Sequence, residues 1–214
     1  GSYSVTSQII ALSEDVRASL AAEDALDVAR MALANDLASV IWVETQHGDA
    51  GDLMAFRGGR QETALSGQDE ELLLSLASAA SLDPGAPFPS HAFNRVEYVL
   101  RRPPEKRGKS KEKLETLQLV RREIPVSTLA WRSGRERSAR ETVLFEAVSA
   151  CAVAFFEGGA ARDSWDSRER RKERRAPLPA QVRLQGAAVF GPKLRVFDLR
   201  AALSPMTYAG GERR

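Results

Sequence analysis

The sequence predicts an α+β protein, in which one long N-terminal helix is followed by an antiparallel β-sheet with wide polar loops. Two observations carry this prediction. Residues 3–46 contain no proline or glycine and repeat their apolar residues at helical spacing. Residues 47–203 instead hold short apolar or alternating segments, separated by polar stretches that contain glycine and proline. The chain is 43% hydrophobic and 28% charged, so it can bury a core.

The predicted helix at residues 3–46 is long for a globular protein. At ~1.5 Å rise per residue it measures about 60 Å, the length of several ordinary helices. Alanine, which has the best helix propensity, fills many of its positions. A small domain cannot cover such a helix, so part of its apolar surface is expected to meet another molecule.

Two apolar stripes run along this helix and are rotated from each other by about a quarter turn. The first consists of Val5, Ile9, Leu12, Val16 and Leu20. The second consists of Leu26, Leu33, Leu37, Val40 and Ile41. We expect the first stripe to face partners or to continue toward a membrane segment, and the last four residues of the second to join the protein's own core. The alternative is one amphipathic helix whose stripe drifts across a single sheet. A sustained coiled coil is not supported, because Ser19 interrupts the heptad series.

Both ends of the chain give separate expectations. Gly1 and Ser2 open the chain without an initiating methionine, as a cleaved expression tag often leaves it. No apolar run is long enough to cross a bilayer. We expect the native helix to continue, before these two residues, into a transmembrane segment that has been removed. The tail at residues 204–214 is polar and expected to be flexible.

Four segments in the first half of the β-rich region are candidate strands. Residues 53–59 predict a short strand that ends in a turn, and residues 95–101 alternate apolar and polar side chains. Residues 114–122 fit a strand that returns from the loop after 95–101. Residues 71–76 are continuous and apolar enough for a strand, although their propensity alone also allows a helix.

The second half of this region predicts three more strands. Residues 151–156 are typical of a buried strand and follow a segment at 143–148 that fits a helical turn. Residues 181–189 and 194–199 are expected to pair as a hairpin through Gly191.

Two charged runs interrupt the β-rich region, at residues 102–113 and 168–175. Each is dense in lysine and arginine and is expected to form a solvated loop; a specific anion or nucleic-acid site is the alternative. The first run has no interleaved aromatic residues for base stacking. Because the formal net charge is only +2, we expect no general nucleic-acid binding.

Residues for catalysis or metal binding do not converge in the sequence. His47 and His91 are the only histidines, and neither has a carboxylate or cysteine at ligand spacing. Cys151 is the only cysteine, so an internal disulfide is excluded and the residue is expected in the core. Two carboxylate pairs in loops are candidates for calcium binding but are typical of turns. They are Asp49 with Asp52 and Asp163 with Asp166. We therefore predict no enzyme, no cofactor and no metal site.

Four groups of residues carry a resemblance to a known family. They are residues 29–37 (ARMALANDL), residues 54–58 (MAFRG), residues 95–100 (RVEYVL) with 117–122 (LQLVRR), and residues 143–148 (VLFEAV) with 153–156 (VAFF), Trp165 and 178–184 (LPAQVRL). The last group is the most specific, because a Leu-Pro-x-x-Val-Arg-Leu pattern follows a tryptophan. With these groups in this order, the sequence resembles the minor pseudopilin J family of the type II secretion system, within the type IV pilin-like superfamily.

The resemblance implies a pilin-like fold and a structural, non-enzymatic role. Such a protein would be a minor subunit at the tip of the pseudopilus, where it primes pseudopilus assembly and supports protein export. Its expected partners are other minor pseudopilins of the I-like and K-like kinds, the major pseudopilin and secreted cargo.

The resemblance also implies a location. The chain would be the periplasmic domain of a single-pass inner-membrane protein of a Gram-negative bacterium, with the methylation known for pilin-like proteins. A minor pilin of a type IV pilus, binding nucleic acid through its basic loops, is the alternative function. An unrecognised periplasmic enzyme with a cleft among the wide loops is a third.

Overall fold

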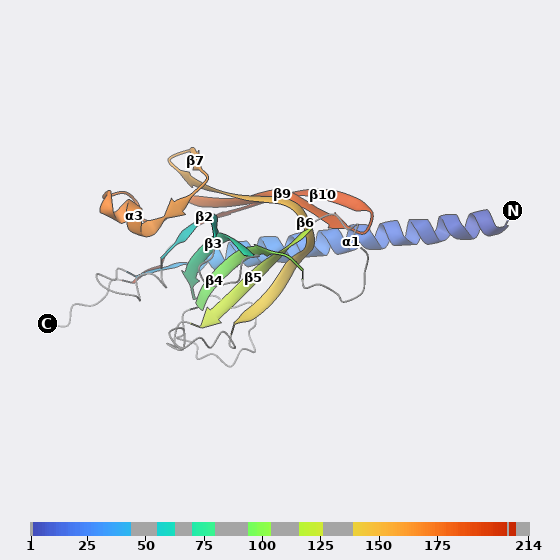
Figure 1. Cartoon of the computed structure of the whole chain (residues 1–214), viewed down its shortest axis with the longest axis horizontal. Helices are drawn as coiled ribbons and strands as arrows, with labels where there is room; N and C mark the ends of the chain where they lie inside the picture. Colours follow the sequence, from blue (N-terminus) through green and yellow to red (C-terminus); the bar gives the residue numbers. More distant parts are fainter. Residues whose placement is uncertain are drawn as a thin grey trace.

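The structure is a computed structural model that describes residues 2–43, 55–62, 70–79, 94–103, 116–125, 139–204 and 206–208. A helix, α1, occupies Ser2–Ala38, and the strands after it build a large antiparallel sheet (Figure 1). The predicted α+β class is confirmed. α1 lies along one face of the sheet, and its N-terminal part projects beyond it. Among the described residues, no helix is both long and apolar enough to span a membrane.

α1 ends earlier than predicted, at Ala38 and not at residue 46. The residues after it are extended: Val40 forms an antiparallel bridge with Ser78, and Ile41–Val43 form strand β1. β1 pairs in parallel with β11, Met206–Tyr208, so the prediction of a frayed tail is wrong for these three residues. Three of the four residues at positions 40–43 are β-branched, which favours extended backbone over helix.

Within the described residues, the main sheet has nine strands. From one edge to the other their order is β10-β9-β6-β5-β4-β3-β2-β8, and β7 pairs with β6. All of these neighbours are antiparallel. The bounds are β2 Arg57–Glu62, β3 Glu70–Ser78, β4 Asn94–Arg101, β5 Leu117–Pro125, β6 Arg140–Glu157, β7 Ala160–Arg162, β8 Trp165–Asp166, β9 Gln181–Phe190 and β10 Lys193–Ala202.

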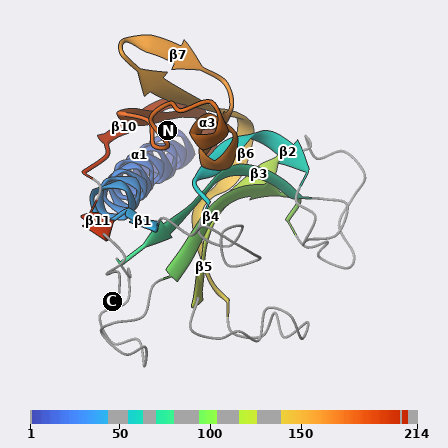
Figure 2. The same cartoon turned by 90° about the vertical axis from the view of Figure 1, so that its left-hand side faces the viewer.

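β6 joins two parts of the sheet because it is long. It runs over 18 residues, pairs first with β5 and then with β9, and shifts register between Val148 and Ala150. The segment at 143–148, which fits a helical turn by sequence, is part of this strand. Seen along the helix, the two parts of the sheet curve around α1 (Figure 2).

The other strand predictions are confirmed with shifted ends. Residues 71–76 lie in β3, which pairs with β2 and β4, so neighbouring strands override the helical propensity. The segments before and after the first charged run form β4 and β5. β9 and β10 form the expected hairpin, and Gly191 in its turn has a left-handed φ of 57°. The predicted strand at 53–59 begins outside the described residues and overlaps β2 only from Arg57 on, and Ala55 and Phe56 precede the strand. The turn predicted at Gly58 and Gly59 is wrong, because both glycines lie within β2.

The second charged run is not a loop throughout. Ser167–Lys172 form a short helix, α3, and Asp166 caps it: the Asp166 carboxylate accepts a hydrogen bond from the backbone N–H of Arg168 at 2.8 Å. The sequence did not predict this helix, because its charged residues also suit a solvated loop and the Asp166 cap is its main local sequence signal. The first charged run lies outside the described residues except for Arg102 and Pro103.

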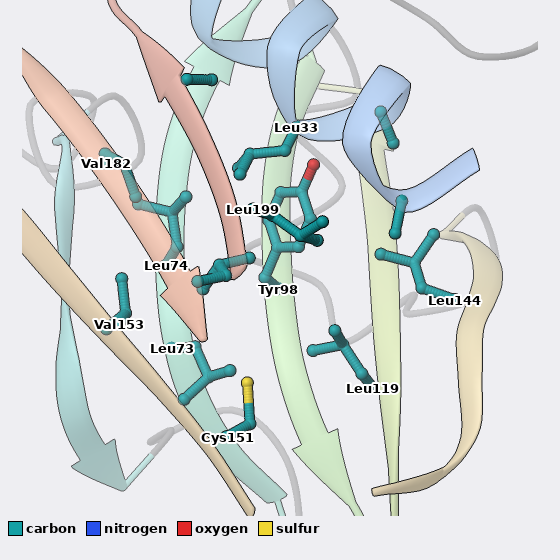
Figure 3. Close-up of a cluster of buried hydrophobic side chains, with 14 of the residues drawn as sticks. Leu33, Leu73, Leu74, Tyr98, Leu119, Leu144, Cys151, Val153, Val182 and Leu199 are labelled. Atoms are coloured by element: carbon teal, nitrogen blue, oxygen red, sulfur yellow. The ribbon is translucent and has the colours of Figure 1, made fainter. Parts of the chain in front are cut away.

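The core lies between α1 and the sheet. Leu33 of α1 is directed toward Tyr98 of β4 and Leu199 of β10 (Figure 3). The same cluster includes Leu74, Leu119, Leu144, Cys151, Val153 and Val182. The four predicted core residues of the helix segment are all buried: Leu33, Leu37, Val40 and Ile41. Leu26 is partly buried against the same core.

Candidate partner-binding face of the long helix

The two sides of α1 differ between residues 12 and 38, where its side chains are described. The inner side is buried and consists of Ala22, Ala29, Ala32, Leu33, Asp36 and Leu37. The outer side is defined as the five exposed large apolar side chains of α1, with exposed fractions of 65% for Leu12, 49% for Val16, 56% for Leu20, 49% for Val28 and 69% for Met31. Water therefore reaches about half or more of each, and covering this outer side would be favourable. Leu12 lies only about 20° around the helix from Leu37. It is nevertheless exposed, because the N-terminal part of α1 projects beyond the sheet.

Three residues of the predicted partner-facing stripe lie on this outer side. Leu12, Val16 and Leu20 are exposed, as a partner-facing role requires. Val5 and Ile9 belong to α1, but their side chains lie outside the described part of the structure. The partner contact of all five residues stays a prediction.

Val28 and Met31 are the residues that the sequence reasoning missed. Each residue turns a helix by ~100°, so Met31 lies about 160° around the helix from Leu33. A side chain two positions before a core leucine faces away from the core. This spacing from Leu33 could have identified Met31 from the sequence. With Val28 and Met31, the exposed apolar side extends into the half of α1 that packs on the sheet.

A buried ion pair holds the C-terminal part of α1 on the sheet. Arg121 of β5 donates two hydrogen bonds to the Asp36 carboxylate, from Nε to Oδ2 at 2.7 Å and from Nη2 to Oδ1 at 2.6 Å. The hydroxyl of Tyr98 on β4 donates a third to Oδ2, at 2.6 Å. These three side chains are at most 1% exposed, and Arg121 also pairs with Glu123 at 2.8 Å. Because a buried carboxylate needs such partners, the network fixes the rotation of α1 on the sheet.

Burial governs protonation in this network. Burial raises the pKa of the Asp36 carboxyl, against the opposing hydrogen bonds and charge of Arg121. It also raises the pKa of Tyr98 well above its usual value, and the negative charge of Asp36 adds to the shift. Burial alone would lower the pKa of Arg121, but its bonds to Asp36 raise it. Tyr98 and Arg121 therefore stay protonated donors to Asp36 at physiological pH.

The β9–β10 hairpin supports α1 nearer its N-terminus. Lys193 forms an ion pair with Asp15 and donates to the Ser19 hydroxyl at 3.5 Å. A Cβ atom added at Gly191 would lie 3.4 Å from the Ala18 side chain, so the turn approaches the helix closely. N-terminal to this hairpin, α1 projects beyond the sheet (Figure 1).

Metal-binding groups are not brought together in the part of the chain that the structure describes. Within it, no group of three or more His, Cys, Asp or Glu could hold a metal ion. His47, His91, Asp49 and Asp52 lie outside the described residues. Cys151 is buried in the core, and burial raises its pKa to about 12, so its thiol is protonated at neutral pH.

The charges around α3 pair within the protein. Arg168 binds the Asp166 carboxylate with Nη2 at 2.7 Å. Burial alone would raise the pKa of Asp166, but the bonds from Arg168 outweigh it and lower the pKa. Arg170 stacks 3.9 Å above the centroid of the Trp165 ring. Asp166 is thus engaged by arginine and a helix end, as expected of a structural carboxylate.

These features define a class of protein: a subunit whose sheet holds a long helix and leaves the outer side of that helix uncovered within the described chain. Over residues 4–188 the chain matches the family described as Type II secretion system (T2SS), protein J, and it belongs to this family. The match confirms the resemblance found in the sequence and assigns the chain to the pseudopilin components of type II secretion. No curated protein and no solved structure gives a significant match to the chain.

Proposed function

We propose that the protein is a non-enzymatic minor pseudopilin, which assembles with other minor pseudopilins through the outer side of α1. One observation carries this proposal: Leu12, Val16 and Leu20 are exposed along one side of a helix that a buried ion pair holds in place. Full burial of one such side chain contributes about 1.5–3 kcal/mol, before the costs of association. Family membership supports a role in the secretion assembly.

The proposal includes the finer features expected from the family. They are a pilin-like fold, a position at the pseudopilus tip, priming of pseudopilus assembly and support of protein export. The domain is proposed to lie in the periplasm, with an inner-membrane segment and a methylated N-terminus on the native protein. The proposed partners are the I-like and K-like minor pseudopilins, with the major pseudopilin and secreted cargo as further contacts. Val5 and Ile9 are proposed to extend the same surface.

Complex formation tests this function. The protein is mixed with the soluble domains of the I-like and K-like pseudopilins of the same secretion system, and the mixture is analysed by size exclusion with light scattering. We expect a complex of defined stoichiometry. The variant Leu12→Asp should abolish it and leave the thermal melt nearly unchanged, because Leu12 is 65% exposed.

Val196→Asp is the matched control. Val196 is 81% exposed but lies on β10, so the same apolar-to-acidic change there should leave the complex intact. A wild-type protein that stays monomeric in a concentrated mixture would contradict the proposed function, as would a Leu12→Asp variant that still binds.

A further inference from the structure

The exposed apolar side of α1 is crossed by an acidic band. Between Leu20 and Met31, the exposed charged residues are Glu23, Asp24 and Asp27, with Arg30 as the one base. Arg30 pairs with Asp27. Glu23 and Asp24 form no ion pair within the described part of the chain. This side of the helix is therefore net acidic, whereas the whole chain has a formal charge of +2.

The acidic band lies on the outer side of α1 by helix geometry. At ~100° per residue, Asp27 lies about 20° from Leu20 around the helix, and Asp24 about 40° from Leu20. Both are exposed, as is Glu23. From Leu12 to Met31 the outer side extends about 28 Å at ~1.5 Å per residue. A partner that covers Leu20 and Met31 must therefore also lie over the carboxylates between them.

We propose that the occupant of this surface is an amphipathic helix of a different chain, which is apolar toward Leu20 and Met31 and carries lysine or arginine opposite Glu23, Asp24 and Asp27. This inference rests on the proposed function and specifies the chemistry of the partner at the same surface. Because the carboxylates lie between Leu20 and Met31, a partner that covers both must place opposite charges against them, and such complementary charges select the partner and its register.

The charges disfavour the other occupants of an exposed apolar helix side. Carboxylates in the middle of the stripe oppose insertion into a bilayer and are repelled by anionic lipid surfaces. They also repel nucleic-acid phosphates. A second copy packed side to side at the same level would place one acidic band against another, and like charges across an interface are costly. A basic helix from another subunit meets none of these obstacles.

The test reverses two charges of the band. The double variant Glu23→Lys with Asp24→Lys leaves the Asp27–Arg30 pair and every apolar residue in place. Its binding to the I-like and K-like soluble domains is measured by titration calorimetry at two salt concentrations. Interactions between exposed charges are weakly screened at ~0.05 M salt and strongly screened at ~0.5 M. We expect a Kd about 10- to 100-fold weaker at low salt, and a difference from wild type that shrinks at high salt.

Two controls make the result specific. Glu169→Lys with Glu173→Lys changes the net charge equally but lies at α3, and should leave the Kd unchanged. Leu20→Asp tests the proposed function separately, because it should abolish binding at both salt concentrations. Circular dichroism melts confirm that each variant is folded.

The outcomes separate the two proposals. An unchanged Kd for the charge-reversed variant, while Leu20→Asp abolishes binding, would overturn the basic partner and leave the helix surface standing. Unchanged binding in both variants would overturn the helix surface itself. A mixed dimer between the charge-reversed variant and wild type, seen by light scattering in place of the complex with the other domains, would show that the occupant is a second copy and overturn the inference.

Discussion

On its inner side, α1 presents Leu33 and Leu37 to the sheet, and both are buried; on its outer side, Leu20 and Met31 are of similar size and more than half exposed. The polar residues differ as well. Asp36 on the inner side receives three hydrogen bonds within the protein, whereas the acidic residues of the outer side lie in water. Both sides of the helix carry regularly spaced apolar residues. The buried Asp36 carboxylate, with its hydrogen-bond partners, distinguishes the side that packs on the protein's own sheet.

The comparison also separates stability from assembly. Residues on the inner side lose their contacts when the protein unfolds, so substitutions there should change the free energy of unfolding. Residues on the outer side have few contacts to lose in the isolated chain, so substitutions there should change association. Each prediction below tests whether this division holds.

The largest effect is expected from breaking the ion pair on one side. Arg121→Met leaves the Asp36 carboxylate buried without its main partner, and the free energy of unfolding should fall by about 3–5 kcal/mol. Urea denaturation monitored by circular dichroism measures this loss. Adding Asp36→Leu to Arg121→Met removes the unpaired Asp36 charge, although Glu123 still lacks Arg121, so the double variant should recover part of the lost stability. A single variant within about 1 kcal/mol of wild type would show that the pair does not hold α1.

The same leucine truncation on the two sides gives a matched pair. Leu33→Ala opens a cavity in the core and should cost about 2–5 kcal/mol. Leu20→Ala removes an exposed side chain and should change the free energy of unfolding by less than about 0.5 kcal/mol. Denaturation curves of the two variants give the comparison directly. Equal losses would mean that the outer side is also part of the folded core.

A smaller loss is expected when one donor of the network is removed. Tyr98→Phe deletes the hydroxyl that donates to Asp36 and keeps the ring in the core, so the free energy of unfolding should fall by about 1–3 kcal/mol. Because Arg121 still binds the carboxylate, this loss should be smaller than that of Arg121→Met. The reverse order would assign the anchoring role to the tyrosine.

No effect on the folded state is expected from a thiol reagent. Cys151 is buried and burial raises its pKa to about 12, so iodoacetamide at neutral pH should leave the native protein unmodified and label the protein in denaturant. Mass spectrometry measures the modified fraction. Rapid labelling of the native protein would show that the sheet opens locally around β6.

The sequence predicted the elements whose signals are local. The alternation at residues 95–101 predicted β4, and the turn glycine predicted the β9–β10 hairpin. Leu33 and Leu37 were predicted in the core from their helical spacing, and the structure confirms both. Exposure of Leu12 was expected from the length of the helix, which no small sheet can cover.

The features that the sequence did not predict depend on distant partners. α1 ends at Ala38 because the following residues pair with Ser78 and Met206–Tyr208, which lie far away in the chain. The partner of Asp36 is 85 residues away, so spacing along the helix could not identify it. Val28 and Met31 were not predicted, because neither belongs to the two apolar stripes of the helix.

The most direct test of the outer side as the partner surface is thiol protection in the assembled complex. Single thiols are introduced by Leu20→Cys, Val28→Cys and, as a control, Val196→Cys, while the native Cys151 stays buried. Labelling rates are measured for the protein alone and with the I-like and K-like soluble domains. We expect labelling to slow several-fold at positions 20 and 28 in the complex and to stay unchanged at position 196. Unchanged rates at 20 and 28, with slowed labelling at 196, would move the interface from α1 to the edge of the sheet and contradict the proposed assembly.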